Sequence, residues 1–232
     1  MKNTKHIFFD LDNTLWDYRK NAGIAIRKIY ESFRIEEKFG YHFDEFYPHY
    51  HQINEDLWEK YRDNKISRKE LQESRFPLSF QDLGIPKPDF AVDFEQQFMD
   101  EISTGQFLVN NAKEILDYLK DKYHIHIITN GFAQTTHYKI NNTILKEYVE
   151  TVVTAEGAGV PKPHPIAFST GIEKSGAEIS ESVYIGDDWV ADIIGATRFG
   201  MEAIFFNPLS ESHKWIENVP VIDDLIEIKN YL

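Results

Sequence analysis

The sequence predicts an α/β protein: a parallel β-sheet with helices on both faces, and a second, all-helical domain inserted after the first strand. Two observations lead to this class. Short apolar runs that end in polar or glycine-containing loops alternate with stretches of helical periodicity, as they do in βαβ units. Between residues 16 and 98 this alternation stops, and apolar residues recur only at helical spacing.

The expected strands share a short apolar run that leads directly into a polar loop. The first run, His6–Phe9, ends in Asp10-Leu11-Asp12, as expected where the carboxyl end of a buried strand reaches a loop. Such strands form a Rossmann-like parallel sheet, which binds ligands beyond the carboxyl ends of its strands. The five expected strands span residues 6–9, 125–128, 152–153, 183–185 and 203–206.

The segments between these runs carry apolar residues three or four positions apart, which predicts amphipathic helices. Each parallel strand starts at the same end of the sheet, so the helix that connects two strands must cross one face of the sheet. Successive helices of this kind cover both faces. The expected helices of this part of the chain lie near residues 112–119, 144–148, 166–172 and 190–197.

Segment 16–98 has the composition of an independent helical domain. It holds 17 of the chain's 33 aromatic residues, enough large side chains to build a core of its own. Helical spacing spans residues 18–33, 47–61 and 90–102, and we expect a turn at 84–88. We therefore divide the chain into an α/β core, residues 1–15 and 99–232, and a helical domain, residues 16–98. Two strands near Trp16 and Phe98 are expected to form the hinge between them.

Composition narrows the possible functions and partners. The 232 residues include 25 Lys and Arg against 38 Asp and Glu, and the net charge of −13 disfavours binding to nucleic acid polymers and to anionic membranes. The absence of cysteine excludes disulfides, thiolate zinc sites and a cysteine nucleophile. Acidic residues interrupt the only apolar run near the N-terminus, so we expect no signal peptide and a cytoplasmic protein.

Asp10 and Asp12 carry the first indication of chemistry. They lie two positions apart just beyond the first strand, so in extended geometry both side chains face the same side. One carboxylate can attack phosphorus, while the other protonates the leaving oxygen and then deprotonates the hydrolytic water. This pair therefore predicts phosphoryl transfer.

Other strand ends supply the groups that such a reaction needs. Thr129 and Asn130 offer a hydroxyl, an amide and backbone N–H groups for phosphate oxygens, and Lys162 offers a positive charge. Asp187, with Asp192 behind it, can complete a magnesium site with Asp10, because Mg²⁺ prefers oxygen ligands. Each of these groups alone is typical of a turn, a solvated loop or a helix cap. Their order after successive strands of one sheet favours a shared site.

The histidines do not indicate a zinc site. The pairs His49/His51 and His124/His126 lack the acidic residue or third histidine that would complete one, so solvated or strand-edge positions are expected for them. The glycines near residue 159 form no dinucleotide-binding fingerprint, and no phosphate-binding loop of the Walker type occurs.

Together these residues resemble a known family. Asp10-Leu11-Asp12-Asn13-Thr14-Leu15, Thr129-Asn130-Gly131, Lys162 and Gly186-Asp187-Asp188 with Asp192 look like the four motifs of the haloacid dehalogenase (HAD) superfamily. The inserted helical segment resembles the type 1 helical cap of that superfamily. Within it, residues 53–58 together with Ile66-Ser67, Leu71 and Arg75-Phe76 resemble the cap of the YjjG/YfnB-type 5′-nucleotidases.

The resemblance implies a HAD-like core and roles for individual residues. Asp10 would be the nucleophile that forms an aspartyl-phosphate, and Asp12 the general acid and base. Thr129 and Asn130 would bind the phosphate, and Lys162 would steady both the nucleophile and the phosphate. Mg²⁺ would lie among Asp10, Asp12 and Asp187, with support from Asp188 and Asp192. Asp188 stands where many members have a small residue, which leaves open which of the adjacent acids touches the metal.

The expected function is that of a magnesium-dependent phosphomonoesterase acting on nucleoside 5′-monophosphates, with a small phosphorylated molecule as its partner. The alternative is a phosphatase of broad specificity for small molecules such as sugar phosphates or phosphoglycolate. A 2-haloacid dehalogenase is disfavoured because Asp12 has no use when halide leaves, and a phosphomutase would differ in how the cap excludes water. A non-enzymatic module is expected to lack one of the motif residues, and none is missing.

Substrate choice is expected to depend on the helical domain. The resemblance to nucleotidase caps involves Asn54, Leu57-Trp58 and Arg75-Phe76, and favours pyrimidine nucleotides or deoxynucleotides. Trp58 or Phe80 is either part of the helical core or an exposed ring that stacks on a base.

Overall fold

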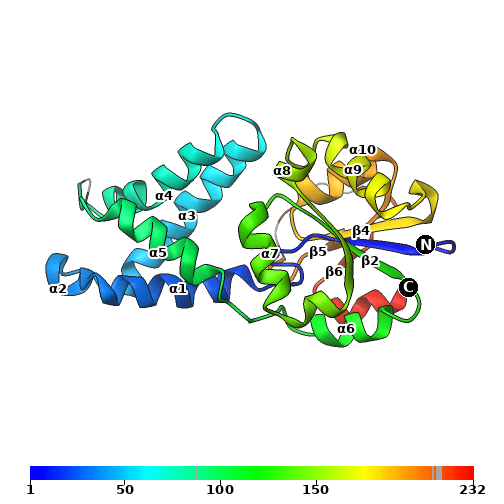
Figure 1. The fold of residues 1–232 in the computed structure, drawn as a ribbon, viewed down its shortest axis with the longest axis horizontal. Coiled ribbons are helices and arrows are strands. Elements are labelled where there is room, and N and C mark those ends of the chain that lie inside the picture. Colours follow the sequence, from blue (N-terminus) through cyan, green and yellow to red (C-terminus); the bar gives the residue numbers. More distant parts are fainter. Residues whose placement is uncertain (87, 211, 213–215) are drawn as a thin grey trace. The chain divides into compact units, whose positions relative to one another are not determined.

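The computed structural model describes residues 1–86, 88–210, 212 and 216–232 of the chain. The chain divides into two compact units, which Figure 1 colours along the sequence. We call Met1–Tyr18 with Gln106–Leu232 the α/β unit, and Arg19–Gly105 the helical unit.

A six-stranded parallel sheet forms the centre of the α/β unit, in the order β3-β2-β1-β4-β5-β6. The first strand lies between the second and the fourth, with His6 opposite both His124 and Ser182. The strands are β1 (His6–Phe9), β2 (His124–Thr129), β3 (Val149–Thr154), β4 (Ser182–Gly186), β5 (Glu202–Phe206) and β6 (Val221–Ile222). The five predicted strands are confirmed. The sixth was not predicted, because a run of two residues carries no readable pattern.

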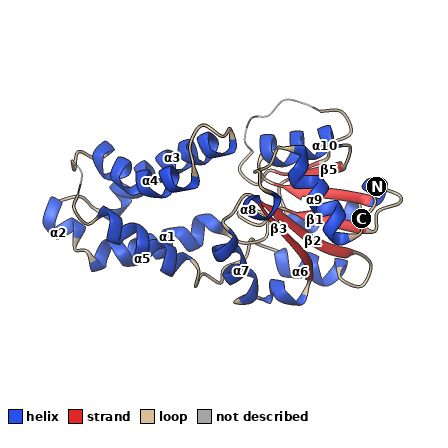
Figure 2. Ribbon diagram, turned by 45° about the horizontal axis from the view of Figure 1, so that its top comes forward, coloured by secondary structure: helices blue, strands red, loops and turns tan. Residues whose placement is uncertain are grey.

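Helices cover both faces of this sheet, as predicted for parallel strands (Figures 1 and 2). The helices α9 (Pro165–Ser175) and α10 (Gly195–Phe199) lie on one face and form a buried core with β1 and β4 that includes Phe8, Phe168 and Tyr184. The α-helices of this unit are α6 (Ala112–Leu119), α7 (Ala133–Asn141), α8 (Ala155–Ala158), α9 (Pro165–Ser175) and α10 (Gly195–Phe199). Shorter helical turns are Ile144–Glu147, Ile179–Glu181, Trp189–Ile194 and Leu225–Asn230.

Two helix predictions in this unit need correction. The helix expected near 144–148 is a single 3₁₀ turn, Ile144–Glu147, because β3 begins only two residues later. The helix expected at 190–197 begins as a wider π-type turn, Trp189–Ile194, and becomes α-helical as α10. Wide turns of this kind often accompany functional sites.

The described residues of the helical unit form five helices around an aromatic core. Phe46 stacks on Phe80 with ring centroids 4.7 Å apart, and Phe76 lies at the same distance from Phe94. Phe80 is fully buried among these rings, so the packing interpretation of that residue is confirmed. The helices are α1 (Tyr18–Ser32), α2 (Ile35–Phe39), α3 (Phe43–Arg62), α4 (Arg68–Asp82) and α5 (Ala91–Ile102).

The boundaries of the units differ from those predicted from spacing. They lie after Tyr18 and Gly105, whereas the prediction divided the chain at 16–98, because α5 continues the buried stripe of Phe94 and Phe98 to Ile102. The strand predicted near Phe98 is wrong, because Phe98 lies in α5; the antiparallel partner of Trp16 is Leu108, within the α/β unit. The turn expected at 84–88 includes Lys87, which lies outside the described residues; Gly84 has a φ of +91°.

Within the described ranges, no helix combines the length and apolar character needed to span a membrane.

Candidate active site

Asp10 occupies the first position beyond β1, at the carboxyl edge of the sheet. Its backbone N–H donates to the carbonyl of Ile185 in β4 at 2.9 Å, which fixes the loop against the neighbouring strand. Its side chain is buried. A carboxylate held in this position faces the region where parallel sheets bind ligands.

Lys162 links the acidic residues at this edge. Its Nζ donates to Asp10 Oδ1 at 2.7 Å, to Asp192 Oδ1 at 2.6 Å and to the Tyr184 hydroxyl at 2.7 Å. An ammonium group has three hydrogens, and these three acceptors satisfy all of them. The buried charge of Lys162 is therefore fully paired.

Asn130 positions the loop that carries Lys162. Its Oδ1 accepts from the Lys162 backbone N–H at 2.7 Å, and its Nδ2 donates to the Lys162 carbonyl at 3.0 Å. Asn130 was predicted to bind phosphate. In this structure its side-chain oxygen and nitrogen both bind the backbone of Lys162 and so link the end of β2 to the loop that carries this lysine.

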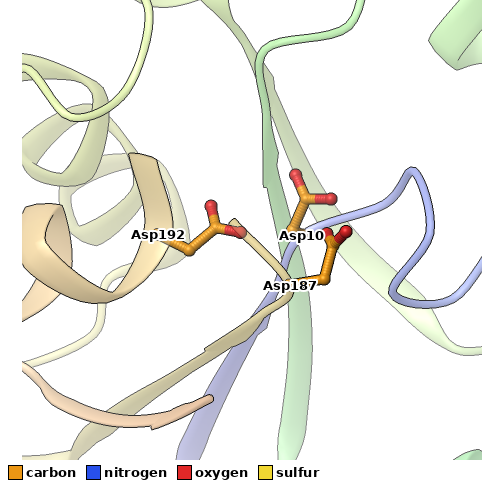
Figure 3. A group of neighbouring side chains, drawn as sticks. All are labelled: Asp10, Asp187 and Asp192. Carbon is orange, nitrogen blue, oxygen red and sulfur yellow. The ribbon is translucent and has the colours of Figure 1, made fainter. Parts of the chain in front are cut away.

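Asp10, Asp187 and Asp192 form one acidic group, with an oxygen of each lying within 4.8 Å of the others (Figure 3). Gly186 permits this close approach, because a Cβ at that position would lie 2.2 Å from Asp192 Oδ2. Thr14 donates from its hydroxyl to Asp187 Oδ1 at 3.1 Å. Such a set of carboxylate oxygens fits a hard divalent cation.

Burial without enough positive charge raises the pKa of every member of this acidic group. Burial raises the pKa of Asp10 to about 7, against the opposing effect of Lys162. Burial, with the charges of Asp10 and Asp192, holds the pKa of Asp187 well above its usual range. The pKa of Asp192 is also raised by burial, although Lys162 opposes the shift. A bound cation would relieve this repulsion, which is the electrostatic sign of a metal site.

Asp188 has a structural contact that separates it from the acidic group. Its Oδ1 accepts from the backbone N–H groups of Val190 and Ala191, both at 2.8 Å, so it caps the following helical turn. Asp192 Oδ2 in turn accepts from the Asp188 N–H at 3.0 Å. Of the two adjacent acids, Asp187 is therefore the one that lies in the group with Asp10.

Thr129 ends β2 and begins the predicted phosphate loop. Its hydroxyl accepts from the Gly131 N–H at 3.0 Å, which curves the loop tightly. A Cβ on Gly131 would lie 3.0 Å from Thr136 Oγ1 and 3.3 Å from both Thr129 Oγ1 and Asp12 Oδ2. Because residue 131 has no side chain, the hydroxyls of Thr129 and Thr136 and the carboxylate of Asp12 can all lie close to this loop.

Asp12 lies outside the acidic group. Its Oδ1 accepts from Lys139 Nζ at 2.6 Å, and Lys139 is buried. The side chains that join the site without having been predicted are Thr14, Thr136, Lys139 and Tyr184. Thr136 and Lys139 are three positions apart on α7, so a helical pattern of polar residues after Thr129 was the available signal.

Known proteins share this arrangement of sequence and fold. A profile of the haloacid dehalogenase-like hydrolases matches residues 4–200. The HAD-hydrolase YfnB of Bacillus subtilis is 26% identical over 230 residues, covering 99% of this chain and 93% of YfnB. A magnesium-bound crystal structure of YfnB, 23% identical by structural alignment, gives a TM-score of 0.87 over 99% of this chain and 98% of that one.

Two further relatives act on different phosphate esters. The ribulose-1,5-bisphosphate 5-phosphatase of Halopiger xanaduensis is 30% identical, covering 89% of this chain and 86% of its own. The pyrimidine 5′-nucleotidase YjjG of Escherichia coli is 27% identical, covering 87% of this chain and 85% of its own.

Proposed function

The chain belongs to the haloacid dehalogenase-like hydrolase family, and from its site we propose that it is a magnesium-dependent phosphomonoesterase that works through an aspartyl-phosphate on Asp10. The observation that carries this proposal is the buried pair of Asp10 and Lys162, with Asp187 and Asp192 beside it at the edge of the sheet. The pair combines a nucleophile with a fixed positive charge, and the neighbouring acids provide oxygen ligands for a cation.

In the first half of the proposed reaction, a carboxylate oxygen of Asp10 attacks phosphorus. The bond between phosphorus and the ester oxygen breaks, and Asp12 gives its proton to the departing oxygen. In the second half, Asp12 takes a proton from water, the water oxygen attacks phosphorus, and the bond between phosphorus and Asp10 breaks. Both carboxyl groups thereby return to their starting states.

Lys162 and the phosphate loop stabilise charge in both halves. Lys162 stays paired with Asp10 and offsets the negative charge that accumulates between the nucleophile and the phosphate. Thr129 and the backbone N–H groups of its loop are the proposed donors to phosphate oxygens. Mg²⁺, held by Asp10 and Asp187 with support from Asp192 and with Asp12 as a further proposed ligand, would supply the remaining positive charge when bound.

The proposed substrates are nucleoside 5′-monophosphates, pyrimidine or deoxynucleotide species first. The support is the likeness to the pyrimidine 5′-nucleotidase YjjG together with an aromatic helical unit. The likeness to a ribulose-bisphosphate phosphatase supports the second candidate, a phosphatase of sugar phosphates and other small esters. A 2-haloacid dehalogenase is the weaker alternative, since a halide leaves without the proton that Asp12 would give. A phosphomutase would need the same groups but would have to exclude water.

Two of the residues expected to select the substrate have structural contacts instead. Arg75 is buried and forms a bidentate ion pair with Glu95, and Phe76 packs in the aromatic core. Trp58 is half-buried and packs edge-on against Tyr61, with ring centroids 5.7 Å apart. Of the residues named for base contact, Trp58 is therefore the one we retain.

A panel of phosphate esters tests the proposal. Nucleoside 5′-monophosphates, sugar phosphates, phosphoglycolate, p-nitrophenyl phosphate and a 2-haloacid are assayed with magnesium and with excess chelator. We expect hydrolysis of phosphate esters only with magnesium, and the highest kcat/KM for a nucleotide. Sugar phosphates ranked above every nucleotide would replace the substrate assignment while leaving the phosphatase assignment standing. Full activity in chelator, or release of halide alone, would contradict the phosphatase assignment.

A further inference from the structure

Lys139 is a buried cation that forms an ion pair with one carboxylate. It lies on the face of α7 that packs into the α/β unit, and its side chain is 5% exposed. A buried ammonium group is unfavourable unless it is paired and hydrogen-bonded. Among the described residues, the acid that pairs with Lys139 is Asp12, at 2.6 Å.

Aromatic rings hold the other side of this lysine. Lys139 Nζ lies 4.3 Å from the ring centroid of Trp16 and 5.6 Å from that of Tyr18. Trp16 is fully buried. Since a cation over a ring face is attracted to it, the position of Nζ is set by the tryptophan as well as by the carboxylate.

The ion pair orients Asp12. Lys139 binds Oδ1, whereas no hydrogen bond to Oδ2 occurs among the described residues. Oδ2 lies 3.3 Å from the position that a Cβ on Gly131 would occupy, and Thr129 Oγ1 lies at the same distance from that position. The unbound oxygen of Asp12 therefore points toward the loop where the phosphate is proposed to bind.

We propose that Lys139 is a positioning residue that holds one oxygen of Asp12 so that the other faces the leaving group of the substrate. This inference rests on the proposed function, because it assumes that Asp12 transfers a proton to that group. Lys139 itself neither touches the substrate nor changes its own protonation in the reaction. Without Lys139 the Asp12 side chain can rotate, and the rate of proton transfer from Asp12 to the leaving group then falls.

The test compares two substrates in the complete enzyme with magnesium. An alkyl phosphate ester needs a proton on its leaving oxygen, whereas p-nitrophenolate leaves without one. Lys139→Met removes the ammonium group and keeps the length of the stem. We expect its kcat to fall at least about tenfold more for the alkyl ester than for p-nitrophenyl phosphate, and Lys139→Arg to recover part of the difference.

Three comparisons separate positioning from packing. Asp12→Asn should likewise lower kcat more for the alkyl ester than for p-nitrophenyl phosphate. In an Asp12→Asn background, adding Lys139→Met should change the ratio of the two kcat values little further, since the two residues act as one unit. Lys113→Met removes an exposed lysine that is 2.6 Å from Asp117, and should leave both rates unchanged. If Lys139→Met does not fold, Lys139→Gln keeps a polar end at this position and is expected to show the same preference.

The outcomes distinguish the inference from the proposed function. Equal loss for both substrates in the Lys139 variants, with a selective loss in Asp12→Asn, would overturn the positioning role alone. Lowered thermal stability with an unchanged ratio of the two rates would do the same. Absence of selectivity in Asp12→Asn, or absence of any ester hydrolysis by the unaltered enzyme, would overturn the proposed role of Asp12 and with it the inference.

Discussion

Asp187 is the residue of the site whose charge is least compensated within the protein. Asp10 and Asp192 each have an ion pair with Lys162, whereas the bond described for the Asp187 carboxylate comes from the Thr14 hydroxyl. Its raised pKa means that the folded chain binds a proton at this carboxyl more tightly than the unfolded chain does. Above the ordinary pKa of an aspartate, the contribution of Asp187 to the stability of the metal-free protein therefore falls as pH rises.

Asp187→Asn should remove part of this dependence on pH, because asparagine resembles the protonated acid. In excess chelator, as pH rises above the ordinary aspartate pKa of 3.8, the unfolding free energy of the unaltered protein should drop by up to about 1.4 kcal/mol per pH unit more than that of the variant. Urea denaturation across this range measures the difference. Asp121→Asn, at an exposed position, is the control that should follow the unaltered protein. Parallel curves for the Asp187 variant and the unaltered protein would contradict the account.

At the scale of helices and strands, two helical glycines show how the surrounding packing decides whether a Gly→Ala substitution stabilises or destabilises the protein. A Cβ on Gly171 in α9 would lie 2.5 Å from Ile128 Cδ1 of β2. A Cβ on Gly23 in α1 would meet Tyr47 at an ordinary contact distance of 3.4 Å. Alanine in a helix gains about 1 kcal/mol over glycine, but overpacking a core costs about 1–3 kcal/mol. We expect Gly171→Ala to lower the melting temperature and Gly23→Ala to raise it; thermal unfolding of the two variants side by side checks both signs.

The contact between α4 and α5 depends on a buried ion pair. Arg75 donates through Nε and Nη2 to the two carboxylate oxygens of Glu95, and burial raises the pKa of Glu95 against the effect of Arg75. Arg75→Met should destabilise the protein by about 3–5 kcal/mol, because it leaves a buried acid without its partner. Adding Glu95→Gln should recover part of that loss in denaturant titrations. A double variant as unstable as Arg75→Met alone would show that the arginine acts through other contacts.

The agreement between sequence and structure differs among these elements for physical reasons. The strands β1 and β4 are buried on both faces, so their apolar runs identify them directly. Asp10, Lys162 and Asp187 follow strand ends, and the topology of a parallel sheet brings such positions together. Helical spacing after Thr129 places Lys139 on one face of α7 with Thr136, but it does not reveal the partner of Lys139, because Asp12 lies 127 positions away. The Asn130 contacts with the Lys162 loop were missed for the same reason.

At the scale of the whole molecule, the α/β unit is the proposed location of the chemistry and the helical unit is the proposed source of substrate selection. Trp58→Ala should raise KM for nucleotides by about 2- to 10-fold and leave KM for p-nitrophenyl phosphate unchanged, the effect expected for loss of one aromatic contact. Phe39→Ala removes a partly exposed ring of the same unit and serves as the control. An equal rise for both substrates, or a loss of folded protein alone, would assign Trp58 to packing.

The central claim is that the phosphoryl group passes through Asp10, and chemical trapping tests it most directly. The enzyme turning over a phosphate ester with magnesium is quenched in acid, treated with borohydride and digested, and the peptide that contains residue 10 is examined by mass spectrometry. Borohydride reduces an acyl phosphate to an alcohol, so we predict homoserine at position 10 and none in Asp10→Asn, which should be folded and without turnover. An unmodified Asp10 during rapid turnover, or an active Asp10→Asn enzyme, would contradict the account.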